Sequence, residues 1–222
     1  MESVLKESVV TAEVNASNER VVPVVQVGGN CVYLFVKRLF DVVVSIFAGV
    51  LLFVPMLLIA GLIHMDSAGP VIYKQERLGK NGKSFIMYKF RTMCLDAEAD
   101  GPKWAEKEDK RCTDFGLKLR KMRLDELPQL WNILKGDMSF VGPRPERPFF
   151  YDEFEVYIPE FRNRLLVKPG LTGHAQVNGG YDLLPEEKII YDMEYIKNRS
   201  LKMDIQCIWK TVMIIFSHDG AR

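Results

Sequence analysis

Residues 42–63 read VVVSIFAGVLLFVPMLLIAGLI, and this stretch decides the fold because none of its 22 residues is charged. A helix needs about 20 residues to cross the ~30 Å hydrocarbon core of a bilayer. Pro55 lies inside the run, and a proline within a helix removes a backbone donor and kinks or interrupts the helix. The run therefore predicts a membrane helix, which either spans the bilayer with a kink or breaks at Pro55 and returns.

Basic residues lie on both sides of this run and help to choose between the two alternatives. Lys37 and Arg38 precede the run, and four more cations follow it: Lys74, Arg77, Lys80 and Lys83. Hydropathy alone favours the kinked span. Positive charge beside a membrane segment, however, favours the cytoplasmic side, and only a re-entrant helix places both flanks there. We therefore predict a re-entrant membrane helix over residues 33–65, broken at Pro55.

The overall composition limits the class of protein. The 222 residues carry a formal net charge of +1, without the basic excess of a nucleic-acid-binding protein, so we expect no nucleic-acid partner. The cysteines are far apart and form no C-x-x-C pair, which favours a reducing compartment and argues against disulfides and structural zinc. They are Cys31, Cys94, Cys112 and Cys207.

The sequence divides into three regions. Residues 1–32 lack a sustained periodicity and are expected to form a loosely ordered extension before the membrane helix of residues 33–65. Residues 66–222 are expected to form one domain at the membrane interface. Its strands are expected at residues 71–74 and 84–91, and its helices at residues 114–123, 127–134, 185–199 and 205–216. The sequence therefore predicts an α+β fold that is mainly helical.

An acidic pair, Asp125-Glu126, lies directly before the expected helix of residues 127–134, with Arg120 and Arg123 just upstream. The positive end of a helix dipole and neighbouring arginines keep a carboxylate ionised. An ionised carboxylate can attack phosphorus to form an aspartyl phosphate, or it can bind Mg²⁺, which prefers oxygen ligands. Taken alone, the pair is better explained by Asp125 as a helix N-cap with a surface ion pair.

Two further segments carry cations in arrangements that suit phosphate. Lys89 and Arg91 occupy alternate positions of an expected strand and should therefore lie on one face. Arg144 lies between Pro143 and Pro145, and a rigid backbone around an arginine suits bidentate recognition of phosphate. Together with the acidic pair, these cations indicate chemistry on a phosphate ester.

These segments belong to longer motifs that resemble those of a known family. The motifs are K-R-x-F-D at residues 37–41, Y-K-F-R-T-M at 88–93, L-D-E-L-P-Q-L-W-N-I-L-K-G-D-M-S-F-V-G-P-R-P-E at 124–146, K-P-G-L-T-G-x-A-Q-V-N-G at 168–179, and Asp204. Over residues 33–215 the chain resembles the monotopic polyprenyl-phosphate phosphoglycosyl transferases, which are also called bacterial sugar transferases.

The resemblance implies that a sugar 1-phosphate is transferred from a UDP-sugar to polyprenyl (undecaprenyl) phosphate, with release of UMP, through a covalent aspartyl-phosphosugar intermediate. It implies that Asp125 is the nucleophile and that Glu126 is its partner in binding Mg²⁺. Residues 66–222 are then the catalytic domain. The matching cations, which are expected to hold phosphate or nucleotide groups, are Lys89, Arg91, Arg120 and Arg144.

The resemblance also implies a setting. The enzyme would be monotopic at the cytoplasmic face of the bacterial cell membrane, in contact with membrane lipids, and would perform the first membrane step of exopolysaccharide, capsule or other glycoconjugate assembly. Larger relatives add spanning helices before the catalytic part, so the chain is expected to be the compact form. The family breaks its helix at Ser-Pro and carries an aromatic residue where this chain has His174; the break here is Val54-Pro55.

Several alternatives stay open at this point. Residues 146–157 and 179–182 resemble hexose 1-phosphate transferases, so glucose or galactose is expected, with an N-acetylated amino sugar as the alternative. A glycosyltransferase that moves the sugar without its phosphate would need a D-x-D motif, which the chain lacks. A noncatalytic membrane adaptor would not need the acidic pair. The sequence also leaves open whether the protein forms a homodimer.

Overall fold

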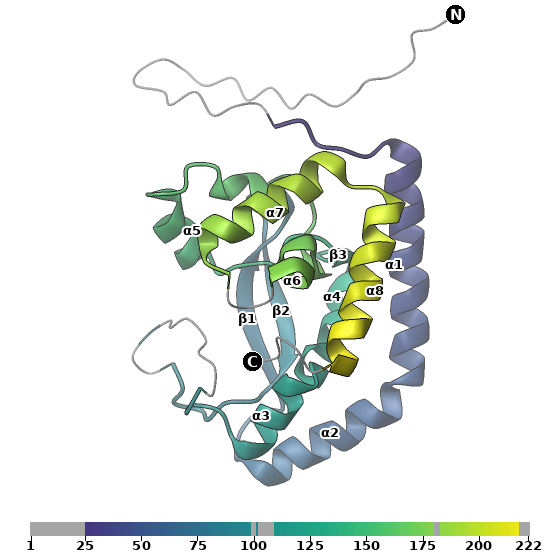
Figure 1. The fold of residues 1–222 in the computed structure, drawn as a ribbon. Helices are drawn as coiled ribbons and strands as arrows, with labels where there is room; N and C mark the ends of the chain where they lie inside the picture. The colour runs from purple at the N-terminus through teal and green to yellow at the C-terminus, as the bar shows by residue number, and fades with distance from the viewer. Residues whose placement is uncertain (1–24, 99–100, 102–108, 180–182, 218–222) are drawn as a thin grey trace, which may run out of the picture.

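The structure is a computed structural model that describes residues 25–98, 101, 109–179 and 183–217, so most of the extension expected at residues 1–32 lies outside it. The α-helices are α1 (Cys31–Leu51), α2 (Phe53–Asp66), α3 (Asp114–Lys121), α4 (Leu130–Lys135), α5 (Pro148–Glu155), α6 (His174–Gly179), α7 (Pro185–Asn198) and α8 (Leu201–Ser217) (Figure 1). The strands are β1 (Ile72–Leu78), β2 (Ser84–Phe90), β3 (Ser139–Val141) and β4 (Gly170–Thr172), and the 3₁₀ helices are η1 (Lys80–Gly82), η2 (Leu124–Gln129) and η3 (Phe161–Leu166). This content confirms a mainly helical α+β fold.

The N-terminal apolar run forms two helices rather than one. α1 ends at Leu51, α2 begins at Phe53, and the two axes are bent by 61°. Pro55 is the third residue of α2 and has no N–H to donate to the carbonyl of Leu51, four residues earlier, so the helix breaks just before the proline. In the described part of the chain no single helix has the length and apolar composition to cross a bilayer, whereas the bent pair together meets both criteria.

Polar side chains in the first half of α1 attach this helix to the rest of the molecule. Arg38 donates two hydrogen bonds of 2.7 Å to backbone carbonyls at the end of α4. Asp41 accepts from the Ser139 hydroxyl at 3.1 Å and from a backbone N–H of β3 at 3.0 Å. Lys37 forms a 2.8 Å ion pair with Asp204 of α8. The K-R-x-F-D motif therefore docks α1, and the two cations that predicted a cytoplasmic flank are bound to protein groups.

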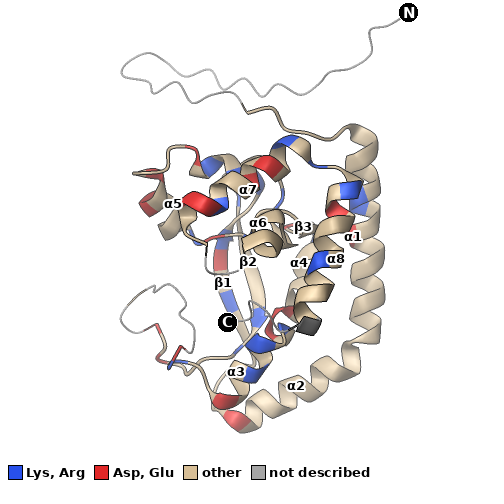
Figure 2. Cartoon of the chain, viewed as in Figure 1, with Lys and Arg blue, Asp and Glu red and all other residues tan. Residues whose placement is uncertain are grey.

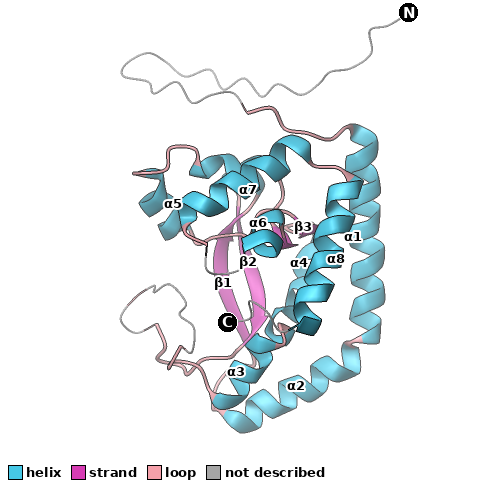
Figure 3. Cartoon of the chain, in the orientation of Figure 1, coloured by secondary structure: helices cyan, strands magenta, loops and turns pink. Residues whose placement is uncertain are grey.

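The larger of the two sheets is the hairpin of β1 and β2, which helices surround on several sides (Figure 3). The strands are antiparallel, and Tyr73 lies opposite Lys89. The hairpin predicted from the sequence is confirmed, although β1 continues to Leu78 rather than ending near residue 74. A second, smaller sheet pairs β3 with β4 in parallel, with Ser139 opposite Gly170.

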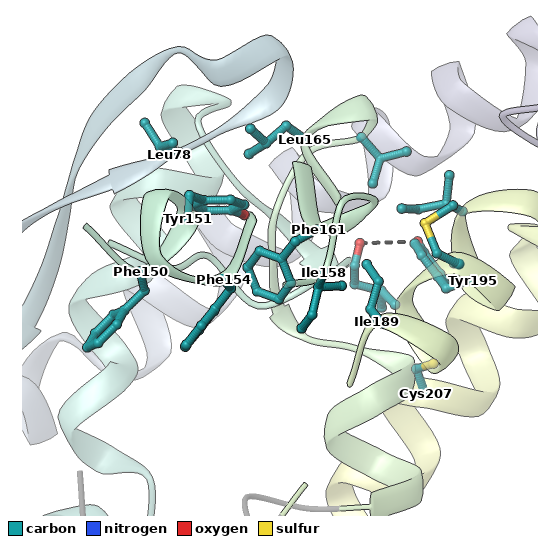
Figure 4. Close-up of a cluster of buried hydrophobic side chains, with 14 residues drawn as sticks. Leu78, Phe150, Tyr151, Phe154, Ile158, Phe161, Leu165, Ile189, Tyr195 and Cys207 are labelled. Atoms are coloured by element: carbon teal, nitrogen blue, oxygen red, sulfur yellow. Dashed lines mark hydrogen bonds between the residues drawn. The ribbon is translucent and has the colours of Figure 1, made fainter. Parts of the chain in front are cut away.

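Two of the hydrophobic clusters among the described residues connect the helices to each other and to the hairpin. The larger one packs α5, η3, α7 and α8 together around aromatic rings such as Phe154 and Phe161, whose centroids are 5.1 Å apart (Figure 4). In the other, Ile59 and Ile63 of α2 pack against Phe90 at the end of β2 and against α3. The second half of the apolar run is therefore anchored next to the strand end that carries Lys89.

Candidate active site

The acidic pair begins a short 3₁₀ helix instead of an α-helix. η2 starts at Leu124 and holds Asp125 and Glu126 in its first turn, where both side chains are buried. Arg123, the residue before η2, has a left-handed backbone with φ 55° and ψ 19°. Such a conformation is uncommon for a residue with a side chain and costs about 1–2 kcal/mol. The turn that presents the pair is therefore held in place by the surrounding structure.

α4, which follows η2, is fixed against β2 by a buried amide. The side chain of Asn132 accepts a 3.1 Å hydrogen bond from the backbone N–H of Tyr88 and donates one of 2.7 Å to the Ile86 carbonyl. The predicted apolar face of residues 127–134 is wrong in part, because Trp131 is 58% exposed while Ile133 is fully buried. A 3₁₀ turn has about three residues per turn, so η2 changes which side chains face the core.

Three of the predicted residues form one ion cluster around Glu126. Lys89 Nζ lies 3.1 Å from Glu126 Oε1 and 3.8 Å from Asp125 Oδ2. Arg144 contacts both oxygens of Glu126, with Nη1 3.5 Å from Oε2 and a shorter contact from Nη2 to Oε1. These segments lie up to 55 residues apart in the sequence, since Lys89 comes from β2 and Arg144 from the loop after β3. The fold thus brings the predicted carboxylates and cations together.

Burial and charge act differently on the two carboxylates. Burial raises the pKa of Asp125 above its ordinary value, and the charges of Lys89 and Arg120 only partly oppose this. Burial also disfavours the charged form of Glu126, but there the charges of Arg144 and Lys89 outweigh it and hold the pKa below its usual range. Burial lowers the pKa of Lys89. Glu126 is therefore the fixed anion of the cluster, and Asp125 is the carboxylate whose charge is less stabilised.

The two remaining predicted cations have other contacts. Arg120 of α3 donates from Nε to the Thr92 hydroxyl at 2.9 Å. Arg91 lies just beyond the end of β2, and its Nη2 and Nη1 atoms donate to the carbonyls of Ser67 at 2.6 Å and Ala68 at 2.9 Å, after the end of α2. β2 ends one residue before Arg91, but the Arg91 N–H still donates to the Val71 carbonyl at 2.9 Å, and both Lys89 and Arg91 line the cavity described below. Phosphate binding by Arg91 stays a prediction, and its observed contacts join β2 to α2.

A cavity of about 760 Å³ opens onto the cluster, and all six predicted catalytic and phosphate-binding residues line it. Its walls carry ten Lys or Arg side chains but only four Asp or Glu side chains. Figure 2 shows charged residues on α3 and β1 next to a nearly uncharged α2. Such an excess of positive charge in a concave site favours anionic ligands, and the volume is that of a small-molecule site.

The donor set of the acidic pair suits Mg²⁺ together with a phosphate ligand. Among the described residues no group of three or more His, Cys, Asp or Glu side chains could hold a metal ion. Magnesium, however, is usually bound by one or two carboxylates, several waters and substrate phosphates. Asp125 and Glu126 supply two carboxylates at the cavity wall, so the residues fit a metal that is completed by its substrate.

Sequence reasoning missed several residues of this site. Arg77 and Lys188 also line the cavity. A buried ion pair, Arg164 Nε to Asp192 Oδ2 at 2.7 Å, lies behind it, and Arg164 Nη2 donates to the Arg144 carbonyl at 2.8 Å. Arg164 therefore helps to fix the loop that carries Arg144. These residues lie outside the quoted motifs, and their sequence neighbours give no sign of the contact.

Comparison with known proteins decides the family. A family model described as "Bacterial sugar transferase" matches residues 32–218. The chain belongs to the bacterial sugar transferase family. Three relatives agree with this assignment. The UDP-N-acetylgalactosamine-undecaprenyl-phosphate N-acetylgalactosaminephosphotransferase of Aeromonas hydrophila is 44% identical over 195 residues, which cover 86% of this chain and 46% of that protein.

The other two relatives carry names with different sugars. The undecaprenyl-phosphate galactose phosphotransferase of Salmonella typhimurium is 39% identical over 202 residues, covering 84% of this chain and 42% of that protein. The UDP-glucose:undecaprenyl-phosphate glucose-1-phosphate transferase of Caulobacter vibrioides is 41% identical over 191 residues, covering 83% and 71%. The chain thus spans less than half the length of two of these three relatives.

Proposed function

We propose that this sugar transferase moves a sugar 1-phosphate from a UDP-sugar to undecaprenyl phosphate and releases UMP. The observation that carries the proposal is the buried Asp125-Glu126 pair, held by Lys89 and Arg144 at the wall of a strongly basic cavity. The relatives' names describe transfers of this kind. A noncatalytic adaptor would not need buried carboxylates whose pKa values are moved in opposite directions, a pattern typical of active sites.

The transfer would proceed by two displacements at one phosphorus atom. In the first, a carboxylate oxygen of Asp125 attacks the phosphorus that bears the sugar, and the bond from that phosphorus to the bridging oxygen breaks, so that UMP leaves with the electron pair. In the second, an oxygen of undecaprenyl phosphate attacks the same phosphorus, and the bond to Asp125 breaks. The carboxylate is regenerated, and the lipid diphosphate sugar is the product.

The remaining residues of the cluster would position the phosphoryl group and neutralise its negative charge. Lys89 lies 3.8 Å from Asp125 and favours its ionised form. Glu126 would orient Lys89 and Arg144, which are placed to stabilise charge on the transferring phosphoryl group. Asp125 and Glu126 would hold Mg²⁺ with the diphosphate, and that ion would neutralise the charge that UMP carries away.

The apolar helix pair would place this chemistry at the membrane surface. α1 exposes large apolar side chains along its outer face, including Val43 at 55% and Phe47 at 68%. The 61° bend fits a segment that enters the bilayer and returns, and the basic flanks favour the cytoplasmic face. A UDP-sugar from the cytoplasm and a lipid phosphate could then meet at headgroup depth. This setting suits the first membrane step of exopolysaccharide, capsule or other glycoconjugate assembly.

The donor we propose is a UDP-hexose, glucose or galactose, and the N-acetylated amino sugar is its nearest competitor. The relatives' names include all three kinds of sugar. The candidate donors can be ranked by the rate of UMP release. The assay would contain one UDP-sugar at a time, undecaprenyl phosphate and Mg²⁺ in detergent. The largest kcat/KM identifies the donor, and addition of a sugar without its phosphate to the lipid would contradict the proposed reaction.

The covalent intermediate gives the most direct test of the proposed function. Incubation of the wild type with the UDP-sugar and Mg²⁺, without lipid acceptor, should release UMP and add one sugar phosphate to the peptide containing Asp125. Mass spectrometry of the intact protein and of its peptides would detect the adduct. Asp125→Asn keeps the shape but removes the nucleophile, so it should form no adduct. If UMP is released only when both substrates are present, direct transfer replaces this mechanism.

A further inference from the structure

A row of polar side chains on β1 lines the cavity beyond the acidic pair. Tyr73, Gln75 and Arg77 are half-buried and line the wall, whereas Lys74 and Glu76 between them are exposed, Lys74 at the edge of the cavity. This alternation is that of a strand with one covered face. Glu146, two residues after Arg144, lines the same wall. We call Tyr73, Gln75, Arg77 and Glu146 the β1 row, and the proposed reaction so far uses none of them.

The β1 row is joined into one hydrogen-bonded chain. Gln75 Nε2 donates to the Tyr73 hydroxyl at 3.0 Å, and Arg77 Nη2 donates to Gln75 Oε1 at 2.5 Å. Arg77 Nη1 donates to Glu146 Oε2 at 3.2 Å and to the Pro145 carbonyl at 3.1 Å. Because Arg77 donates to the oxygen of Gln75, the amide is held in one orientation. Its nitrogen and oxygen therefore have fixed places along the wall.

The fixed amide leaves a defined hydrogen-bonding pattern for a ligand. A primary amide has two N–H donors and two acceptor lone pairs, so Gln75 keeps one donor and one acceptor after its contacts with Tyr73 and Arg77. Uracil presents the complementary pair, a carbonyl oxygen beside an N–H. Cytosine presents the reverse order, with an amine beside an unprotonated ring nitrogen. An amide that cannot turn over therefore distinguishes the two bases.

The other members of the row suit the rest of a nucleoside. Glu146 keeps acceptor sites beyond its ion pair with Arg77, and a carboxylate that accepts from ribose hydroxyls is a recurring element of nucleotide binding. The ring of Tyr73 offers a face on which a base can stack. We propose that the β1 row binds the uridine half of the donor, a refinement that rests on the proposed function.

The direction of the row along the sheet agrees with the chemistry of the transfer. Tyr73 lies opposite Lys89, which contacts the acidic pair. Gln75 and Arg77 are two and four residues further along β1, which is about 7 and 13 Å at 3.3 Å per residue. In an in-line displacement the leaving group departs on the side away from the nucleophile. The row begins opposite Lys89 and continues along the cavity wall, where it can hold the nucleoside of the departing UMP.

Direct binding of UMP to the full-length protein in detergent tests the assignment without any need for turnover. Calorimetry on the wild type should show UMP bound at least about tenfold more tightly than CMP, the effect of one mismatched polar pair. Gln75→Leu should weaken the binding of UMP by a similar factor and abolish the preference for UMP over CMP. Arg77→Lys, which releases the amide but keeps the charge, should reduce the preference and leave CMP binding unchanged or stronger.

A second ligand pair tests Glu146. The wild type should bind 2′-deoxy-UMP about tenfold more weakly than UMP, and Glu146→Gln should bind both with nearly equal affinity. Glu76→Gln, on the exposed side of the same strand, is the matched control and should behave as wild type. Circular dichroism and thermal unfolding should show that all variants are folded.

Two outcomes would overturn the assignment. If the Gln75 and Glu146 variants keep wild-type affinities and preferences for all nucleotides, the row does not contact the nucleoside. If UMP binding is unchanged but the affinity for hexose 1-phosphates shifts, the row faces the sugar instead. A wild type that binds UMP as expected but releases none from any UDP-sugar would count against the proposed reaction and not against the uridine site.

Discussion

Asp125 and Glu126 are neighbours in the chain, yet the fold raises the pKa of Asp125 and lowers the pKa of Glu126. Glu126 receives contacts from both Lys89 and Arg144, so its ionised form is stabilised. Asp125 is just as buried, but the shortest ion-pair distance given for it among the described residues is 3.8 Å, to Lys89. A charge that is buried with incomplete compensation is costly for stability and useful for reactivity. This difference supports Asp125 as the reacting group and Glu126 as its support.

The difference predicts stability changes of opposite sign. The pKa of Asp125 is raised in the folded state, so its contribution to stability is present below the ordinary value of about 3.9 and is lost as the pH rises. Once Asp125 is ionised in the folded protein it therefore costs stability, and Asp125→Asn should raise Tm at pH 7 by a few degrees while abolishing turnover. Thermal unfolding at pH 7 measures the gain.

Glu126 provides the control for this prediction. Its pKa is lowered, so its stabilisation is present above about 4.3 and is lost as the pH falls through the lower folded value. Glu126→Gln should therefore lower Tm at pH 7, and the Tm difference between Asp125→Asn and wild type should shrink toward pH 4. A lower Tm for Asp125→Asn at pH 7 would contradict the proposed role of burial.

Arg144 makes a contact with Glu126 that another cation could not reproduce. Its guanidinium approaches both oxygens of Glu126, and its main-chain carbonyl is fixed by Arg164. A lysine cannot make a forked contact, so Arg144→Lys should reduce kcat/KM at least about tenfold, or ~1.4 kcal/mol. Arg162→Lys, a partly exposed arginine with two acidic neighbours, is the matched control. Near-normal kinetics for Arg144→Lys would mean that its fork is not used on the substrate.

Some of the contacts among these residues could be predicted from the sequence and others could not. The acidic pair, Lys89 and Arg144 do meet, because the motifs that carry them are local and specific. Arg91 lies in the same motif but donates to the end of α2. Lys188 could not be foreseen, since only the packing of α7 brings it to the cavity wall. The spacing of residues in the sequence predicts which side chains share a face of one helix or strand. It does not predict contacts between elements that are far apart in the sequence.

At the scale of elements, the break in the apolar run shows how one proline acts. The sequence predicts a break at Pro55, and the helix ends at Leu51 instead. The reason is the direction of helical hydrogen bonds, since a missing N–H affects the carbonyl four residues earlier. Pro55 itself fits the first turn of α2, where backbone N–H groups have no partner within the helix. β2 and α7 were predicted to within one residue, because turn residues and periodicity bound them, whereas β1 ends four residues later than predicted.

Labelling from outside the cell tests whether the α1–α2 pair enters the membrane and returns to the same face. In a chain whose other cysteines are replaced, the exposed Cys31 and a cysteine at the exposed Lys80 position should both resist an impermeant thiol reagent added outside intact cells. Pro55→Ala should favour a continuous helix and reduce activity several-fold by moving the catalytic part from its depth. Both sites should react after the cells are lysed. Labelling of either one from outside the cell would contradict the re-entrant arrangement.

At the scale of the whole molecule, one carboxylate joins three helices. Asp204 of α8 accepts from Lys37 and Tyr33 of α1 at 2.8 and 3.0 Å, and from Tyr195 of α7 at 2.7 Å. The Tyr195 hydroxyl, whose one proton goes to Asp204, also lies 3.2 Å from the Val141 carbonyl. The apolar helix pair is therefore held to the catalytic part by a buried polar network as well as by packing.

Loss of this network should loosen α8. Asp204→Asn removes the charge that Lys37 and two hydroxyls share, and breaking a buried pair costs about 3 kcal/mol. For a chain of this size Tm should fall by about 6–12 °C. Cys207, one turn further on and 1% exposed, should react faster with a thiol reagent. Asp152→Asn, at an exposed ion pair, is the control, and an unchanged thiol rate in Asp204→Asn would exclude this role.

Arg91 has a consequence for how the lipid environment acts on the enzyme. Its guanidinium donates hydrogen bonds to the carbonyls just beyond α2. Lys89, which is two residues before Arg91 in the sequence, contacts the acidic pair. If α2 rests in lipid as proposed, a thicker or thinner bilayer that tilts this helix would pull directly on the strand that carries Lys89. The rate of the transferase would then depend on the acyl-chain length of the surrounding lipid. It would be highest at the bilayer thickness that leaves Lys89 in its position beside the acidic pair.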